Sequence, residues 1–158
     1  MQKIYPCLWF DNQAEEAANF YVSIFKENSK ILDIARYTDI GPGKPGSVVT
    51  VTFELNGQRF MGLNGGPVFK MNEAISFVID CKDQADVDYY WDSLVKGGAE
   101  SQCGWLKDRY GLSWQVVPAM MEELMSKGNE KKNDAMMKAM LGMAKLDIAA
   151  LQRTYDEA

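Results

Sequence analysis

The sequence predicts an α+β protein built from two tandem βαβββ modules that form a curved, cup-like mixed sheet, followed by C-terminal helices. The first observation is a repeat, because Asn12-Gln13-Ala14-Glu15 returns 71 residues later as Asp83-Gln84-Ala85-Asp86. The second is that a strand-like run precedes each copy, and an amphipathic helical pattern with aromatic residues follows it. A two-copy repeat of this long period indicates a duplicated half-domain and not a solenoid.

The first module is predicted to cover residues 1–66. Its strands are expected at 4–10, 29–37, 47–55 and 58–64, and its helix at 13–25, with Asp11 or Asn12 supplying the N-cap oxygen. The Asn56-Gly57 pair favours a type I′ hairpin turn, since that turn needs positive φ at both central residues.

The second module is predicted to cover residues 67–118. We expect a strand at 74–80, a helix at 84–96 ended by Gly97-Gly98, one or two short strands within 100–107, a turn at 108–111 and a strand at 112–117. The two modules would together make one duplicated domain, 1–118.

Residues 119–158 are predicted to form an appended pair or trio of helices rich in methionine. Two interpretations stay open for these methionines. They pack against the protein's own domain or a dimer mate, or they form an adaptable surface for a partner, since methionine fills irregular interfaces well.

The composition excludes several classes of protein. A formal net charge of −5 argues against nucleic acid as a partner, whose binding depends on clustered lysine and arginine. The longest apolar stretches are strand-length and interrupted, so we expect no membrane partner. Three cysteines without CxxC spacing, and no secretory signal pattern, predict a cytoplasmic protein with reduced thiols. Cys103 is the one candidate reactive thiol, because Lys107 and Arg109 follow it.

The chain contains no histidine, so it lacks the usual general base near neutral pH and the commonest transition-metal ligand. The segment 41–46, GPGKPG, matches the spacing of a dinucleotide-binding loop, but it holds two prolines and a strand pattern follows it where a helix should begin. We therefore expect no cofactor, and the catalytic residues are unknown.

Four segments resemble a known family: residues 8–17 (LWFDNQAEEA), 55–61 (LNGQRFM), 63–67 (LNGGP) and 103–115 (CGWLKDRYGLSWQ). They are similar to the vicinal oxygen chelate (glyoxalase/bleomycin-resistance/dioxygenase) superfamily, in its PhnB-like branch, which carries the label 3-demethylubiquinone-9 3-methyltransferase. The resemblance implies two βαβββ modules curving around a shared cup, commonly in homodimers.

The resemblance also implies where metal ligands would lie in metal-using members: at about Pro6, within 60–62, at Ala74 and at Gln115. None of these is a good ligand, and Gln115 falls where a glutamate is usual. We therefore predict no metal site, and a metal-dependent lyase, isomerase or dioxygenase becomes the second hypothesis. The methyltransferase label is not expected to describe the activity, because no strand, glycine loop and helix unit for a methyl-donor nucleotide is present.

The leading hypothesis is a cytoplasmic homodimer whose metal-free cup binds a small, partly aromatic or apolar molecule. Strand alternation places Val78 and Ala74 on the cup side with several predicted binding residues. The full set of predicted binding residues is Asn64, Ser76, Trp105, Arg109, Ser113 and Gln115. Arg109 is expected at the rim, where a guanidinium could hold an anionic group. A third hypothesis makes the methionine-rich tail the working surface of a protein-interaction module.

Overall fold

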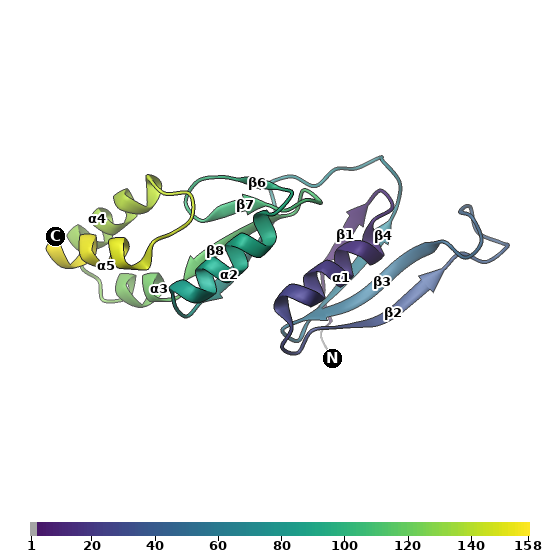
Figure 1. Ribbon diagram of the computed structural model, residues 1–158, viewed down its shortest axis with the longest axis horizontal. Helices are drawn as coiled ribbons and strands as arrows, with labels where there is room; N and C mark the ends of the chain where they lie inside the picture. Colours follow the sequence, from purple (N-terminus) through teal and green to yellow (C-terminus); the bar gives the residue numbers. More distant parts are fainter. Residues whose placement is uncertain (1–2) are drawn as a thin grey trace. The chain divides into compact units, whose positions relative to one another are not determined.

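The computed structural model describes residues 3–158 and divides the chain into two compact units, Met1–Met71 and Asn72–Ala158. Each unit holds one βαβββ module with its own four-stranded mixed sheet, and three helices follow the second module (Figure 1). The predicted α+β class and its two modules are therefore confirmed. The units separate after Met71, a few residues beyond the predicted end of the first module.

The first unit contains β1 (Cys7–Phe10), α1 (Ala14–Phe25), β2 (Lys30–Arg36), β3 (Val48–Leu55) and β4 (Gln58–Asn64). Its strand order is β1-β4-β3-β2, with β1 parallel to β4 and the other neighbours antiparallel. Figure 1 shows α1 lying across one face of this sheet. Small residues at Ala14 and Gly62 allow α1 to pack closely on β4, because a Cβ added at Gly62 would lie 3.2 Å from the Ala14 Cβ.

The hairpin between β3 and β4 forms as predicted, with φ of 49° at Asn56 and 79° at Gly57. The predicted cap of α1 is wrong. The N-cap residue is Gln13, which makes no side-chain capping hydrogen bond. The oxygen comes from β4 instead, where Asn64 Oδ1 accepts a hydrogen bond of 2.9 Å from the Ala14 backbone N–H.

The second unit opens with β5 (Ser76–Cys81), α2 (Gln84–Val95), β6 (Ala99–Glu100), β7 (Trp105–Lys107) and β8 (Ser113–Pro118). Its strand order is β5-β8-β7-β6, with β5 parallel to β8. The helix buries Val87, Trp91 and Leu94. The side chains that form the rest of this core alternate along the strands, and include Ile79, Leu106, Trp114 and Val116.

The duplication is also visible in the backbone. At the end of the first parallel strand pair, Gly65 N–H donates to the Phe10 carbonyl at 2.9 Å. At the matching place in the second module, Ala119 N–H donates to the Cys81 carbonyl at 2.8 Å. The strand registers correspond as well, since Cys7 pairs with Met61 as Val78 pairs with Gln115.

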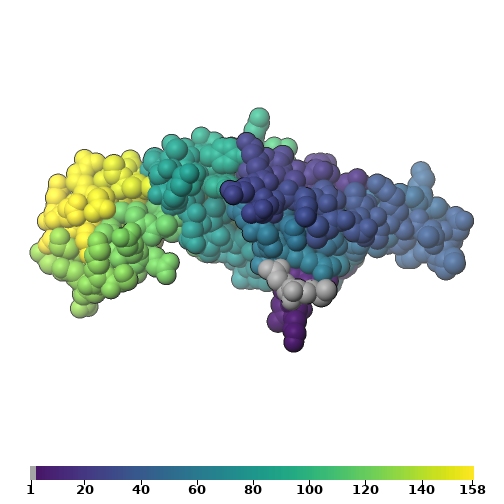
Figure 2. Space-filling view, turned by 90° about the horizontal axis from the view of Figure 1, so that it is seen from below, coloured from purple at the N-terminus to yellow at the C-terminus, as the bar shows by residue number. Residues whose placement is uncertain are grey.

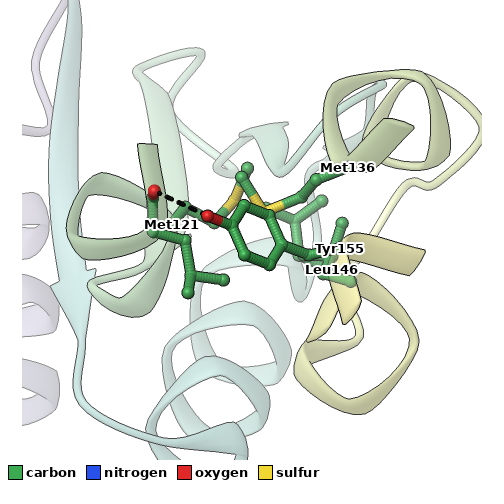
Figure 3. Close-up of a cluster of buried hydrophobic side chains, with 6 residues drawn as sticks. Met121, Met136, Leu146 and Tyr155 are labelled. Carbon is green, nitrogen blue, oxygen red and sulfur yellow. Dashed lines mark hydrogen bonds between the residues drawn. The ribbon is translucent and has the colours of Figure 1, made fainter. Parts of the chain in front are cut away.

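The C-terminal extension consists of three helices, α3 (Met120–Met125), α4 (Glu130–Leu141) and α5 (Ile148–Glu157). They enclose a buried cluster of Met121, Leu124, Met136, Leu146, Leu151 and Tyr155 (Figure 3). The Tyr155 hydroxyl donates to the Leu124 carbonyl at 3.3 Å. In the space-filling view of Figure 2, the atoms of α4 and α5 gather into one compact group. Met121 and Met136 are therefore core residues of the extension.

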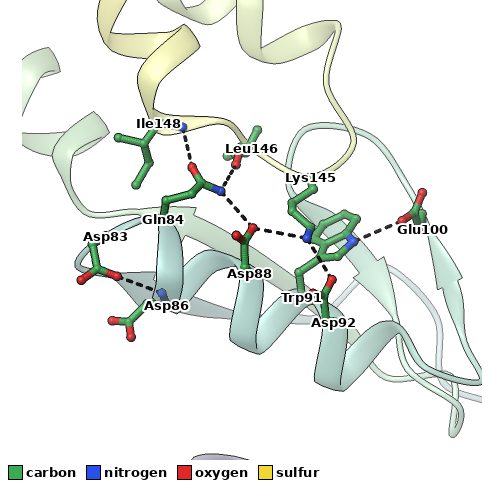
Figure 4. A network of polar contacts seen from close by, with 10 residues as sticks. All are labelled: Asp83, Gln84, Asp86, Asp88, Trp91, Asp92, Glu100, Lys145, Leu146 and Ile148. Carbon is green, nitrogen blue, oxygen red and sulfur yellow. Dashed lines mark hydrogen bonds and ion pairs between the residues drawn. The ribbon is translucent and has the colours of Figure 1, made fainter.

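A polar network attaches the extension to α2 (Figure 4). The Gln84 amide donates to the Leu146 carbonyl at 3.1 Å and accepts from the Ile148 N–H at 2.8 Å. Lys145 forms ion pairs with Asp88 at 3.3 Å and Asp92 at 2.9 Å. The hydrogen bond to Asp92 is the main reason that the pKa of Lys145 is raised.

Among residues 3–158, no helix has the length and apolar character needed to cross a membrane.

Candidate ligand-binding face of the second sheet

Alternate side chains of β5, β8 and β7 point away from α2. We call six of them the open face: Ser76, Val78, Trp105, Lys107, Ser113 and Gln115; Asp80 and Val117 follow as the next pair along β5 and β8. The strand registers arrange these six in two rows. One row runs Ser76, Ser113, Lys107, and the next runs Val78, Gln115, Trp105. Four of the predicted binding residues, Ser76, Trp105, Ser113 and Gln115, therefore lie together on one side of one sheet.

The polar groups of the open face are partly connected. Gln115 Nε2 donates a hydrogen bond of 2.9 Å to Ser76 Oγ, which ties β8 to β5 and fixes the orientation of the amide. Val78, beside Gln115, is an apolar side chain that stays 57% exposed. Trp105 is half-buried next to Gln115 on the other side. The face thus combines apolar area with oriented hydrogen-bonding groups, the usual make-up of a small-molecule site.

Ser113 is the most unusual residue of this face. Its side chain is on the open side, yet only 1% of the residue is exposed, and its hydroxyl has no hydrogen-bond partner among residues 3–158. A buried polar group without a partner costs about 1–3 kcal/mol. Such a group calls for an explanation, and a functional role is one that fits its position among polar neighbours.

Lys107 stands beside Ser113 and forms an ion pair with Glu73, which precedes β5. The hydrogen bond from Lys107 is the main reason that the pKa of Glu73 lies below its usual range. Neither residue is among the predicted binding residues, and Lys107 enters the sequence predictions only as a cationic neighbour of Cys103. Strand alternation could have placed Lys107 on the open face, because its neighbour Leu106 on the same strand is an apolar core residue.

Arg109 lies apart from the rows of the open face, in the turn between β7 and β8. Its side chain packs beside Gly97, just after α2, where an added Cβ would lie 3.4 Å from Arg109 Cβ and 3.6 Å from Nε. Its predicted place at the rim of a cup stays a prediction.

The turn that carries Arg109 is organised by Asp108, which is only 3% exposed. Its carboxylate accepts hydrogen bonds from the backbone N–H groups of Tyr110 at 2.8 Å and Leu112 at 3.1 Å, and from the Trp114 indole at 2.9 Å. From the sequence, residues 108–111 are predicted to form a turn, with no role for the Asp108 carboxylate. Aspartate bonding to backbone groups two residues ahead is a common device in turns, so that part of its role had a recognisable signal.

Asn64 belongs to the first unit and has a different role from the open-face residues. It pairs with buried Phe10, on the side of the sheet that α1 covers. Its amide bonds the Ala14 N–H and the Val48 carbonyl, the latter at 3.2 Å. Its side chain therefore holds α1 and β3 in place, and we do not include it in the proposed site.

The residues at the predicted metal positions do not fit a metal ion. In the second module Gln115 donates its amide N–H to Ser76, and Ala74 offers only a methyl group. In the first module the paired open-face residues are Cys7 and Met61, and partial burial raises the pKa of the Cys7 thiol. Within 3–158, no three His, Cys, Asp or Glu residues group closely enough to hold a metal.

The strand positions, sheet orders and uncovered face can be compared with known proteins. The family model described as 3-demethylubiquinone-9 3-methyltransferase matches residues 2–117, which is most of the chain. The chain belongs to this family. Because the match ends at residue 117, the helical extension lies beyond the part that the family shares.

Solved structures of other proteins share the fold of this chain. A putative 3-demethylubiquinone-9 3-methyltransferase, a PhnB protein from Bacillus cereus, is 39% identical with a TM-score of 0.69, covering 75% of this chain and all of its own. A Pseudomonas aeruginosa protein is 16% identical, with a TM-score of 0.62 and coverage of 75% and 98%. The fosfomycin resistance protein FosX from Listeria monocytogenes is 13% identical, with a TM-score of 0.57 and coverage of 77% and 94%. No curated protein matches the chain.

Proposed function

We propose that this PhnB-like family member binds a small, partly aromatic or apolar molecule on the open face of its second sheet, without a metal. The observation that carries the proposal is the buried Ser113 hydroxyl, which has no partner within 3–158 and lies between Ser76 and Lys107. Trp105 and Val78 supply apolar contact area beside it, while Ser76 and Gln115 supply an oriented polar pair.

Two wider expectations belong to the same proposal. Residues 1–118 would act as one duplicated domain, and the protein would be a cytoplasmic homodimer. The family resemblance supports these expectations, and Arg109 stays a predicted binding residue. Native mass spectrometry of the protein purified from its own host tests the dimer and any co-purifying small molecule together.

Substitution of open-face residues tests the location of the site. With a ligand from that purification, Gln115→Ala should weaken binding by about 5-fold, the worth of one neutral hydrogen bond. Trp105→Ala should weaken it by at least about 10-fold through lost apolar contact. Gln102→Ala, at an exposed position, is the control. If Gln115→Ala, Trp105→Ala and Arg109→Ala all bound the ligand as the wild type does, the assignment would be wrong.

Elemental analysis distinguishes the proposal from the metal-dependent alternative. We expect less than stoichiometric divalent metal in protein purified without an affinity tag, because within residues 3–158 no three His, Cys, Asp or Glu side chains group closely enough to hold an ion. One bound divalent ion per chain would favour a lyase, isomerase or dioxygenase and contradict the proposal.

The geometry supports neither the methyltransferase label nor the third hypothesis, an interaction module that uses the methionine-rich tail. Residues 41–46 lead into strand β3 and not into a helix, so they do not form a nucleotide-binding loop of the kind that methyl transfer would use. In the extension, Met121 and Met136 are buried in its own core. Neither methyl transfer nor partner capture by the methionine-rich tail is therefore proposed.

A further inference from the structure

The ion pair between Lys107 and Glu73 lies at one end of the open face, where β5 and β8 begin and β7 ends. Lys107 is on β7 and Glu73 precedes β5, while β8 lies between these two strands. The row that contains Lys107 continues through Ser113 to Ser76, three residues after Glu73. The pair therefore links the strands on either side of β8 at the level of Ser113.

The ion pair between Lys107 and Glu73 can be replaced by an ion pair between Lys107 and a bound molecule. The side chains of Lys107 and Glu73 are 39% and 61% exposed. Exposed ion pairs contribute little to stability, because solvent screens them and two long side chains must be ordered. A carboxylate from a bound molecule could therefore replace the Glu73 carboxylate at small cost to the fold.

The surroundings of the Lys107 ammonium indicate what kind of anion it would take. The adjacent Ser113 hydroxyl is a donor that the fold leaves unused within residues 3–158. An ammonium and a hydroxyl together can bind the two oxygens of one carboxylate. Glu73 already offers that group to Lys107 from within the chain. One cation matches one negative charge, and Trp105 and Val78 lie in the next row to receive an apolar part.

We infer that the open face binds a monocarboxylate with an aryl or alkyl part, whose carboxylate takes the place of Glu73 on Lys107 and accepts a hydrogen bond from Ser113. The inference rests on the proposed function and adds the class of ligand. Glu73 acts as an internal competitor for the Lys107 ammonium group.

An NMR titration tests this inference with named probes. Phenylacetate, indole-3-acetate and hexanoate are compared with their uncharged amides, while the side-chain N–H signals of Gln115 and Trp105 report binding at the open face. We expect shifts with the carboxylates and weaker shifts with the amides. Glu73→Gln should lower the dissociation constant of the carboxylates at least about 3-fold, since the competing charge is removed.

The other variants should act in the opposite direction. Lys107→Met should weaken carboxylate binding at least about 10-fold, and Ser113→Ala about 5-fold, as expected for a charged and a neutral hydrogen bond. Glu27→Gln and Lys138→Met change exposed residues elsewhere and should leave the dissociation constants unchanged. A dispersed spectrum for each variant shows that it is folded.

Each contrary outcome has its own meaning. If Glu73→Gln bound the carboxylates no more tightly than the wild type, the internal competitor would be ruled out and the inference overturned. If acids and amides bound equally with shifts at Gln115 and Trp105, the carboxylate class would be wrong while small-molecule binding at the open face would stand. If no probe shifted the open-face signals in any variant, the carboxylate inference would be overturned, while the proposed function would still be decided by the variants tested with the co-purified ligand.

Discussion

At the scale of single residues, Cys81 shows how the fold controls a side chain's chemistry. It ends β5, is completely buried, and directs its thiol toward the Ile79 carbonyl at 3.7 Å. Burial raises its pKa to about 12, and the nearby carboxylates of Asp86, Asp80 and Asp83 add to the effect. The folded protein therefore keeps this thiol neutral well above the pH at which an unfolded chain would ionise it.

This difference predicts a loss of stability at alkaline pH. An unfolded cysteine ionises near pH 8.5, so the contribution of Cys81 is complete below that pH and declines as the pH rises toward 12. The decline should approach about 1.4 kcal/mol per pH unit. Urea unfolding at pH 7, 9 and 10.5 should show that Cys81→Ala loses less stability than the wild type. Cys103→Ala is the control, and parallel losses in wild type and Cys81→Ala would contradict the prediction.

Individual residues also show which parts of the site the sequence can predict. Ser76, Ser113 and Gln115 could be placed on one face because strand alternation is a local rule. Strand alternation gave no support for Asn64, whose amide caps a helix that is distant in sequence. The partners of Glu73 and Lys107 depend on which strands become neighbours, which alternation alone does not reveal.

At the scale of elements, Gln84 joins two helices at their N-termini. Asp83 and Asp147 cap α2 and α5 with their own side chains. Gln84, in the first turn of α2, then binds the backbone on both sides of Asp147. The same amide is the main cause of the lowered pKa of Asp88. One glutamine thus sets the position of α5 on α2 through backbone atoms.

Loss of this amide should loosen α5 without unfolding the sheet. Gln84→Ala removes hydrogen bonds to the Leu146 carbonyl and the Ile148 N–H, so we expect about 1–3 kcal/mol of lost stability. Hydrogen exchange should speed up in 146–157 and stay slow in β8. The control is Gln102→Ala, in an exposed loop. Unchanged protection of α5 in Gln84→Ala would show that the amide is not what holds it.

Most elements could be predicted because their signals are local. The Asn56-Gly57 hairpin and the helix beginning at Gln84 needed only turn chemistry and periodicity. The short β6 is different, since its two residues become a strand only by pairing with Lys107 and Leu106 of β7. The predicted cap of α1 was wrong because it too depends on a distant segment: the acceptor, Asn64, lies on β4.

At the scale of the whole molecule, the extension is an addition to the second unit. Backbone N–H groups of Cys103 and Gly104 donate to the carbonyls of Met143 and Ala144, each at 2.8 Å. Leu146 packs at Gly104, where an added Cβ would lie 3.1 Å from its side chain. The Bacillus cereus structure is covered completely by 75% of this chain, so a related fold exists without an added segment of this length.

Removal of residues 120–158 should therefore leave a folded protein with a lower free energy of unfolding. The lost hydrogen bonds and the burial of Leu146 amount to roughly 3–4 kcal/mol, which corresponds to a fall of about 10 °C in the midpoint of thermal unfolding. Circular dichroism follows the transition, and a retained sheet signal shows that the core is folded. An unchanged midpoint would mean that the extension adds nothing to the stability of the second unit.

The paired strand ends of the two modules have a practical consequence. The contacts from Gly65 to Phe10 and from Ala119 to Cys81 involve main-chain atoms only, so they persist although the four side chains differ. Side chains pointing to the uncovered side of the second sheet can in the same way be varied while this frame is kept. Randomising Ser76, Val78 and Gln115 should yield a library of folded proteins from which new receptors can be selected.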